Sequence, residues 1–376
     1  VLKDDASRVA NVPADGVAKL TWPIEAASAG AASITAEAIA TDRSAMDAIE
    51  MPFEVFPHGA RASVLAGGRA APSSTASMTM DPESKLEGAS LRIEITPSFA
   101  GAILQGLQYL AIYPWGCVEQ TISSFVPDVL VKRASEQGGL PISESLRQDL
   151  PRMIAAGVKR LREMQHPDGS WGWYTEPEAD MAMTAYALIG LVEARKAGAS
   201  IPDDMLQRAA AWIRSHTIQE LPPRPEQRDW AKAGPGYLGH LEARAYALMA
   251  AAATGAGDQD RFEPLWARRT EMTNVAIACM GLAAAETGRK PELEAAARML
   301  ESRQTRNSGM ALWRSAETRY YWSDAGTTAM ALRALTRAGR STEQLEPVTR
   351  YLAAKRDGGY WNSTRDSALA ILALLE

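Results

Sequence analysis

The side chains of Cys117 and Gln120 are spaced so that they can react with each other. They lie in the run YPWGCVEQT at positions 113–121. A thiolate at Cys117 that attacks the side-chain carbonyl of Gln120 and expels ammonia closes a small ring through an internal thioester. Gly116 is expected to let the backbone bend before the cysteine, and Pro114 to keep a helix from running unbroken through the turn. The motif therefore predicts an activated acyl donor.

Because a C-x-E-Q string is short, three plainer readings stay open. Cys117 alone is typical of a buried core thiol, as is Cys279 within the apolar stretch 276–282. Cys117 with a histidine would make a cysteine hydrolase, in which Gln120 has no covalent role. A helical scaffold with a concave binding surface would need neither residue.

The bulk composition excludes several classes of function. The 376 residues are 46% hydrophobic and 23% charged, which is ordinary for a soluble globular protein of more than one domain. A net charge of −5 without a Lys/Arg run argues against a nucleic-acid partner. The sequence contains no H-E-x-x-H, paired C-x-x-C or Gly-rich phosphate loop, so no metal or cofactor is expected. No apolar stretch has the length needed to span a membrane.

The first 95 or so residues predict β structure. Apolar and polar residues alternate at 17–22, 32–36, 53–56 and 91–95, with Gly, Pro and Asp between these runs. The pattern is typical of antiparallel sandwich segments. Because the segments are few for a complete domain, we expect sequence beyond Glu376 to complete it.

From about Ser98 the pattern predicts helices in a weak repeat of helix pairs. Ala-rich apolar runs recur at 186–191, 246–249, 276–282, 329–335 and 368–372. The first four run into a glycine, as at a helix C-terminus: Gly198, Gly255, Gly288 and Gly339. Stacked helical hairpins with closely packed inner helices indicate a closed α/α toroid.

Two aromatic–glycine turns precede inner helices in this repeat. They are QHPDGSWGW at 165–173 and DGGYW at 357–361. Asp-Gly sets the turn, and the aromatic ring is expected to wedge between helix ends. We therefore predict a packing role for these turns and no ligand contact.

The runs at both ends of the helical part resemble one known family. They are ITPS at 95–98, LQYL at 107–110, YPWGCVEQ at 113–120 and YWNSTRDSA at 360–368. They are similar to the start and the last inner helix of the thioester domain in the alpha-2-macroglobulin and complement family. The YPWG before the cysteine resembles the bacterial branch. The resemblance covers residues 96–376, and the β segments more weakly.

This resemblance implies that the protein is a covalent protease trap that reacts once. It would then not be an enzyme that turns over. In the family, a protease cuts a bait segment elsewhere in the molecule, and a nucleophile of the protease, mainly a lysine amine, then attacks the exposed thioester. By carry-over, Cys117 is the thiol partner and Gln120 the acyl partner, while Glu119 completes the motif. Tyr113 takes the place of a hydrophobic shield that keeps water from the thioester.

The resemblance also implies the surroundings of the chain. Residues 1–95 would be β-sandwich segments of a macroglobulin-like or CUB-like domain, and residues 96–376 a mainly α toroid with the thioester. The expected partners are proteases and neighbouring macroglobulin-like domains, in the periplasm, with any membrane anchor outside this chain. The polar start VLKDDASRVA carries neither a signal peptide nor Met, which fits either a cytoplasmic protein or, as we favour, a fragment of an exported one.

Complement-type members use a histidine to direct the acyl group to hydroxyls. No histidine matches that position among the four present, His58, His166, His216 and His240. His240 is expected to precede an inner helix, at an end where it could face the motif, although a surface or capping role is the default for it and for His166. Direct transfer that favours amines is therefore expected.

Residues 161–171 also resemble the repeat of triterpene cyclases, which share the toroid. Those enzymes use a D-x-D-D motif, and Asp203-Asp204 lacks the rest of it. The zinc-ligand set of protein prenyltransferases is also missing from the sequence. Fold similarity alone does not argue function, so a cyclase remains the weaker alternative.

Overall fold

The computed structural model describes residues 1–14, 16–56, 58, 75, 77, 79–83, 89–91, 93, 116–136, 142–175, 178–217, 234–255, 259–316, 322–356 and 360–376. The chain divides into two compact units. One is Val1–Val64 with Thr79–Ile93, and the other is Leu65–Met78 with Glu94–Glu376.

The first unit contains a two-stranded antiparallel sheet. Strands β1 (Gly30–Ile39) and β2 (Met46–Val55) pair in a register that places Gly30 opposite Val55 and Ile39 opposite Met46. The predicted strands at 32–36 and 53–56 are confirmed, apart from the last residue of the second. Their apolar side chains, such as Ile34 and Ile49, remain exposed, because a two-stranded ribbon has no second layer to cover them.

The other two predicted strands do not appear among the described residues. Residues 17–22 do not form a strand, and Val17 is 93% exposed to solvent. The segment with alternating residues therefore has no partner strand to pair with. Leu91 and Ile93 are not in a strand, and the rest of 91–95 lies outside the described residues. The assignment of residues 1–95 to a macroglobulin-like or CUB-like domain stays a prediction.

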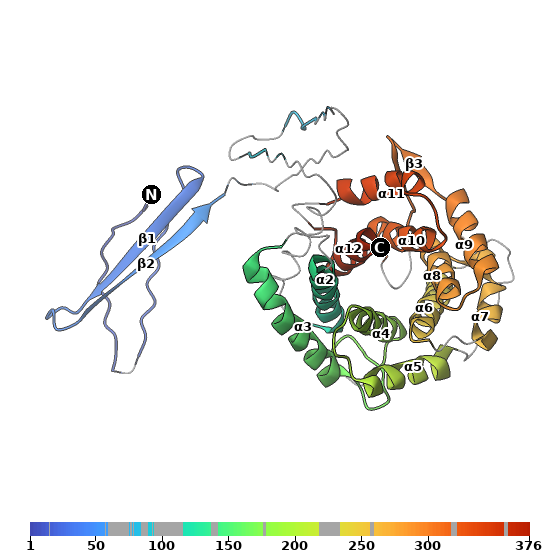
Figure 1. Ribbon diagram of the computed structural model, residues 1–376. Helices are drawn as coiled ribbons and strands as arrows, with labels where there is room; N and C mark the ends of the chain where they lie inside the picture. Colours follow the sequence, from blue (N-terminus) through green and yellow to red (C-terminus); the bar gives the residue numbers. More distant parts are fainter. Residues whose placement is uncertain are drawn as a thin grey trace. The chain divides into compact units, whose positions relative to one another are not determined.

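The second unit is a ring of helices in two layers (Figure 1). The inner layer consists of α2 (Val118–Glu136), α4 (Met181–Lys196), α6 (Gly234–Ala253), α8 (Asn274–Glu286), α10 (Asp324–Arg337) and α12 (Thr364–Leu375). The outer layer consists of α3 (Glu144–Met164), α5 (Asp203–Thr217), α7 (Gln259–Trp266), α9 (Lys290–Ser302) and α11 (Thr342–Ala354). Among the described residues, this unit also contains a short helix η2 (Arg269–Glu271) and a hairpin of β3 (Thr305–Asn307) and β4 (Met310–Leu312).

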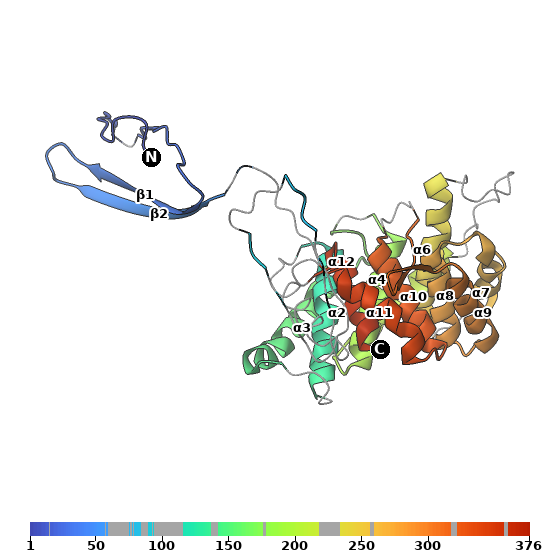
Figure 2. The same cartoon turned by 90° about the horizontal axis from the view of Figure 1, so that it is seen from above.

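The last inner helix, α12, packs against the first, α2, and this contact closes the ring. A view turned by 90° about the horizontal axis shows the helices of the ring lying side by side (Figure 2). The predicted α/α toroid is confirmed. No helix among the described residues combines the length and apolar character that crossing a membrane requires.

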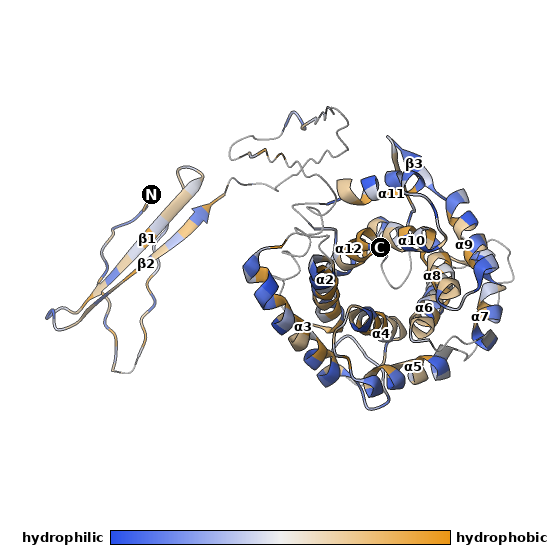
Figure 3. Ribbon diagram, viewed as in Figure 1, coloured by the Kyte–Doolittle hydropathy of each residue, from blue (hydrophilic) through white to orange (hydrophobic). Residues whose placement is uncertain are grey.

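The sequence explains which helices are inner and which are outer. Inner helices such as α8 are apolar on all sides and almost fully buried, whereas outer helices such as α9 carry one apolar face and one polar face (Figure 3). All five predicted apolar runs lie in inner helices. Small residues allow neighbouring inner helices to approach closely: a Cβ on Gly190 of α4 would lie 2.8 Å from the methyl groups of Ile122 and Val126 of α2.

The four predicted glycine caps are confirmed. Gly198, Gly255, Gly288 and Gly339 have φ between 73° and 90°, the left-handed conformation that ends a helix at little cost for glycine. After three of them, the next N–H reaches back to a carbonyl in the last turn. These bonds join Ala199 to Ala194, Arg289 to Ala284 and Arg340 to Leu335.

Tryptophan wedges tie outer helices to the inner helices that follow them. In each wedge the indole N–H donates to a leucine carbonyl at 2.7–2.9 Å, and the backbone N–H donates to a Ser or Thr hydroxyl of the next inner helix. The sets are Trp171 with Leu161 and Thr184, Trp313 with Leu300 and Thr328, and Trp361 with Leu352 and Ser367. The packing role predicted for Trp171 and Trp361 is confirmed. The wedge at Trp313 was missed, because no Asp-Gly pair marks it.

Candidate functional site

Cys117 lies directly before α2, at the N-terminal end of the inner layer. Its carbonyl accepts hydrogen bonds from the backbone N–H and the hydroxyl of Thr121, at 3.0 and 2.9 Å. The next N–H, of Val118, donates to the carbonyl of Trp173 at 2.8 Å. These bonds fix the cysteine in a tight turn with 6% of its surface exposed. Burial raises the pKa of the Cys117 thiol, and the negative charge of Glu119 raises it further.

The structure brings Cys117 and Gln120 together in one turn. The backbone N–H of Cys117 donates to the side-chain Oε1 of Gln120 at 3.1 Å. The carbonyl group that a thioester would use is therefore held against the backbone of its thiol partner. The two residues that the sequence paired do share a site.

Gly116 is needed here for space and not for its backbone freedom. Its φ is not in the left-handed range, so the expected glycine-dependent bend is not what the structure shows. A Cβ at this position would lie 1.9 Å from Oε1 of Gln120 and 3.0 Å from its Cδ. Any larger residue would push the Gln120 carboxamide out of its place.

The carboxylate of Glu119 joins α2 to its two neighbours in the ring. It accepts a hydrogen bond from the hydroxyl of Ser123 at 2.8 Å and one from Thr364, at the start of α12, at 2.9 Å. Ser123 is also 2.9 Å from the hydroxyl of Tyr186 in α4. Glu119 thus sits at the closure of the ring, a role for which the motif alone gave no reason.

Arg160 of the outer helix α3 also contacts the motif. Its Nη2 donates to the carbonyl of Gly116 at 2.7 Å. The sequence gave no signal for this residue, because 44 positions separate it from its partner and it stands in an ordinary amphipathic helix.

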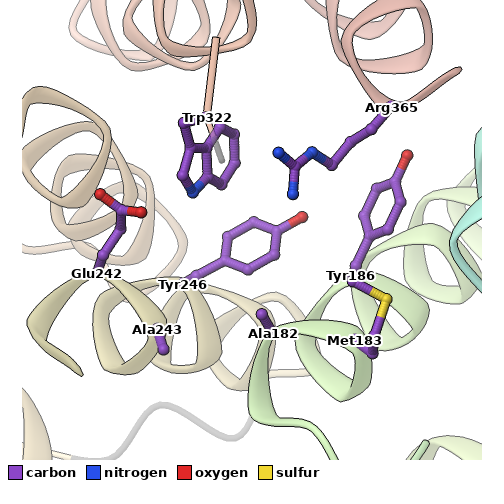
Figure 4. Close-up of a pocket in the computed structure, with 8 residues that line it drawn as sticks. All are labelled: Ala182, Met183, Tyr186, Glu242, Ala243, Tyr246, Trp322 and Arg365. Carbon is purple, nitrogen blue, oxygen red and sulfur yellow. The ribbon is translucent and has the colours of Figure 1, made fainter. Parts of the chain in front are cut away.

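A small pocket opens at the same end of the inner helices (Figure 4). Its free space is about that of one water molecule. The Tyr246 hydroxyl points toward the guanidinium group of Arg365 (Figure 4) and has no hydrogen-bond partner among the described residues. Glu242 is held by the hydroxyl of Thr273 at 2.8 Å. The pocket is lined by Ala182, Met183, Tyr186, Glu242, Ala243, Tyr246, Trp322 and Arg365.

The remaining predicted residues have structural surroundings or lie outside the description. Tyr113 is outside the described residues. His166 contacts the hydroxyl of Ser170, and His216 stacks on Trp212. His240 lies inside α6 and not before it, and both His240 and His58 are exposed. Cys279 is fully buried in α8, as expected of a core thiol. In the described parts of the chain, no three His, Cys, Asp or Glu side chains gather as metal ligands would.

Comparison with known proteins identifies the relatives of this chain. The family described as A-macroglobulin TED domain matches residues 92–220, which include the Cys117–Gln120 motif. The alpha-2-macroglobulin of Thermotoga maritima is 27% identical over 287 residues, covering 76% of this chain and 15% of the relative. The chain therefore spans less than a fifth of the length of that relative.

Two solved structures share the fold. Native Escherichia coli alpha-2-macroglobulin, from domain MG7 to the C-terminus, is 21% identical with a TM-score of 0.58, covering 73% of this chain and 41% of that one. Salmonella alpha-2-macroglobulin reacted with methylamine is also 21% identical with a TM-score of 0.58, covering 73% of this chain and 17% of that one. Residues 92–220 match the TED domain of the alpha-2-macroglobulin family, and about three quarters of the chain is similar to bacterial alpha-2-macroglobulins.

Proposed function

We propose that Cys117 and Gln120 form an internal thioester and that this chain is the acylating part of a covalent protease trap. The observation that carries the proposal is the 3.1 Å hydrogen bond from the Cys117 N–H to Oε1 of Gln120, in space that Gly116 leaves free. The match of residues 92–220 to the TED domain family supports it independently.

The atoms of Cys117 and Gln120 alone balance the formation of the bond. The Cys117 sulfur attacks Cδ of Gln120, the C–N bond breaks, and the amino group leaves as ammonia with the thiol proton. The raised pKa of the thiol disfavours the thiolate, so the turn must supply proximity instead of a pre-ionised nucleophile.

Transfer then consumes the thioester once. An amine attacks the acyl carbon of residue 120, the C–S bond breaks, and the amine proton passes to the Cys117 sulfur. The products are a substituted amide and a thiol, so one chain acylates one target and does not turn over. The methylamine reaction of the Salmonella protein supports amine acceptors for this chain too.

Direct transfer to amines also agrees with the surroundings of the histidines. His166 and His216 are engaged within the Asp-Gly turn and on α5, respectively. We therefore propose lysine amines of an attacking protease as the main acceptors, with hydroxyls as poor ones. Tyr113 is proposed to shield the bond from water until a bait segment outside this chain is cut.

The wider setting follows from the family. The proposed partners are proteases and the neighbouring macroglobulin-like domains of a longer protein, and residues 1–95 would belong to one or more of those domains. The proposed location is the periplasm, since the relatives are bacterial alpha-2-macroglobulins.

Labelling with competing nucleophiles tests this function. Protein treated with methylamine or glycerol would be digested, and the peptide containing Cys117 and Gln120 analysed by mass spectrometry, with Cys117→Ala as control. We expect a methylamide at position 120 that depends on Cys117, and little glycerol ester. Equal labelling by glycerol would refute the amine preference. Steady turnover of a small ester would point to a cysteine hydrolase instead.

A further inference from the structure

The peptide unit between Gly116 and Cys117 is hydrogen-bonded at both ends. Its carbonyl accepts from Arg160 at 2.7 Å, and its N–H donates to Oε1 of Gln120 at 3.1 Å. A cation, a peptide dipole and the reacting carbonyl therefore stand in one line of hydrogen bonds. Residues 116 and 117 supply the backbone, and α3 supplies the charge.

Both steps of the proposed chemistry place negative charge on that same oxygen. When sulfur attacks Cδ of Gln120, or an amine attacks the thioester carbon, the C=O double bond opens and its electron pair moves to the oxygen. A fixed N–H donor at this oxygen stabilises the tetrahedral state more than the ground state. The Cys117 N–H has the position of such a donor.

Arg160 can strengthen this donor through the peptide. Hydrogen bonds in a chain polarise one another, and a charged donor on the carbonyl side makes the N–H on the other side more acidic. Arg160 is half-buried, and within the described part of the chain no carboxylate lies within ion-pair distance to neutralise it. The carboxylate of Glu119 is held instead by the hydroxyls of Ser123 and Thr364.

We propose that the Cys117 N–H acts as an oxyanion donor for acyl transfer at residue 120, and that Arg160 is the positioning residue that aligns and polarises it through the Gly116 carbonyl. This inference rests on the proposed thioester function and adds two roles to it, one for the Cys117 backbone N–H and one for Arg160, which lies outside the Cys-Gln motif. Arg160 touches no reacting atom, so its effect must appear in rates and not only in folding.

The test measures the rate constant for methylamine attack per thioester formed, in the whole chain. Intact-protein mass spectrometry gives the amount of thioester first, and the methylamide is then followed with time. The variants are Arg160→Met, which removes the charge, and Arg160→Lys, which keeps the charge but lacks the planar guanidinium group. Arg162→Met, on the exposed face of the same helix, is the matched control.

We expect Arg160→Met to lower the rate constant by roughly tenfold, below the loss seen when an oxyanion donor itself is removed. Arg160→Lys should recover part of the loss, millimolar methylguanidinium should partly restore Arg160→Met, and Arg162→Met should match the wild type. A rate constant for Arg160→Met equal to the wild type would overturn the inference.

If Arg160→Met does not fold, the rate constant of Arg160→Lys tests the inference instead. A rate constant at least about threefold below the wild type, at an unchanged unfolding temperature, supports the inference, and an unchanged rate constant overturns it. A wild-type chain that forms no thioester would instead refute the proposed function, and this inference would fall with it. If the wild type forms the thioester and the Arg160 substitutions do not change the rate constant, only this inference is refuted.

Discussion

The two ends of the helix ring are built from different interactions. The N-terminal ends of the inner helices carry the Cys117–Gln120 turn and the small pocket, where charged groups such as Glu119 and Arg160 are hydrogen-bonded to neutral groups. The C-terminal ends carry an ion network. Its members are Glu193, Lys196, Glu286, Arg333, Arg337 and Glu376.

If the proposed function holds, the N-terminal ends of the inner helices carry the chemistry, and the ion pairs at the C-terminal ends stabilise the fold. Arg333 is 4% exposed and bonds to Glu376 at 2.6 Å, so the network clamps α10 to the end of α12. At the opposite end the Tyr246 hydroxyl lacks a partner among the described residues. Substitutions at the reactive end should therefore change chemistry first, and substitutions at the ionic end should change stability first.

The largest effect is expected from Gly116→Ala. The new methyl group would overlap Oε1 of Gln120, so the carboxamide must leave the Cys117 N–H and thioester yield should fall by about a hundredfold or more. Intact-protein mass spectrometry measures the yield. Gly198→Ala is the matched control, because that glycine has φ +90° with nothing near its Cβ position. It should lose stability and keep the thioester, and a normal yield in Gly116→Ala would contradict the account.

At the ionic end, Arg333→Met should cost about 3–5 kcal/mol of unfolding free energy, because it leaves the carboxylates of Glu376 and Glu193 without their buried partner. Chemical denaturation measures this loss. The thioester yield of the folded fraction should not change. A loss of yield at full stability would show that the two ends are coupled.

Between the two ends, Asp128 in α2 makes stability depend on pH. Neither of its carboxylate oxygens has a partner in the described structure, and burial raises its pKa well above the ordinary value. At this group the folded state then binds more protons than the unfolded state, so the contribution of Asp128 to stability is largest below the unfolded pKa of about 4 and falls as pH rises. Asp128→Asn should raise the unfolding free energy at pH 8 by about 1–3 kcal/mol. The gain should vanish near pH 3 in thermal melts, and an equal gain at both pH values would refute the assignment.

The smallest effect is expected from Glu119→Gln. The amide oxygen can still accept from Ser123 and Thr364, although without charge, so stability should fall by about 1 kcal/mol. Glu119→Ala should lose more, since both hydroxyls lose their acceptor. Thermal unfolding of the pair compares them. Equal stability of the two variants would show that Glu119 does not hold the closure of the ring.

Local patterns in the sequence predicted much of the fold. Apolar runs predicted the inner helices, and glycines after them predicted the caps, because both features depend on neighbours in the chain. The strand predicted at 17–22 was wrong, because alternation shows only that a segment suits a sheet and not that a partner strand exists.

The sequence predicted that Cys117 and Gln120 would lie together, but not which residues support them. Cys117 and Gln120 are one turn apart, so their spacing was informative. Arg160 and Thr364 reach the motif from positions 44 residues or more away, which no local pattern records. The function of Gly116 was also hidden, because the clash that a Cβ would cause appears only once the Gln120 side chain is placed.

The most direct test of the central claim is the mass of the intact chain in neutral buffer. A thioester between Cys117 and Gln120 predicts a mass lower than that of the sequence by one ammonia, which methylamine should convert to a methylamide with one new free thiol. Cys117→Ala should show neither change. A wild-type chain at its full sequence mass, with Gln120 unmodified and Cys117 a free thiol before and after methylamine, would contradict the account.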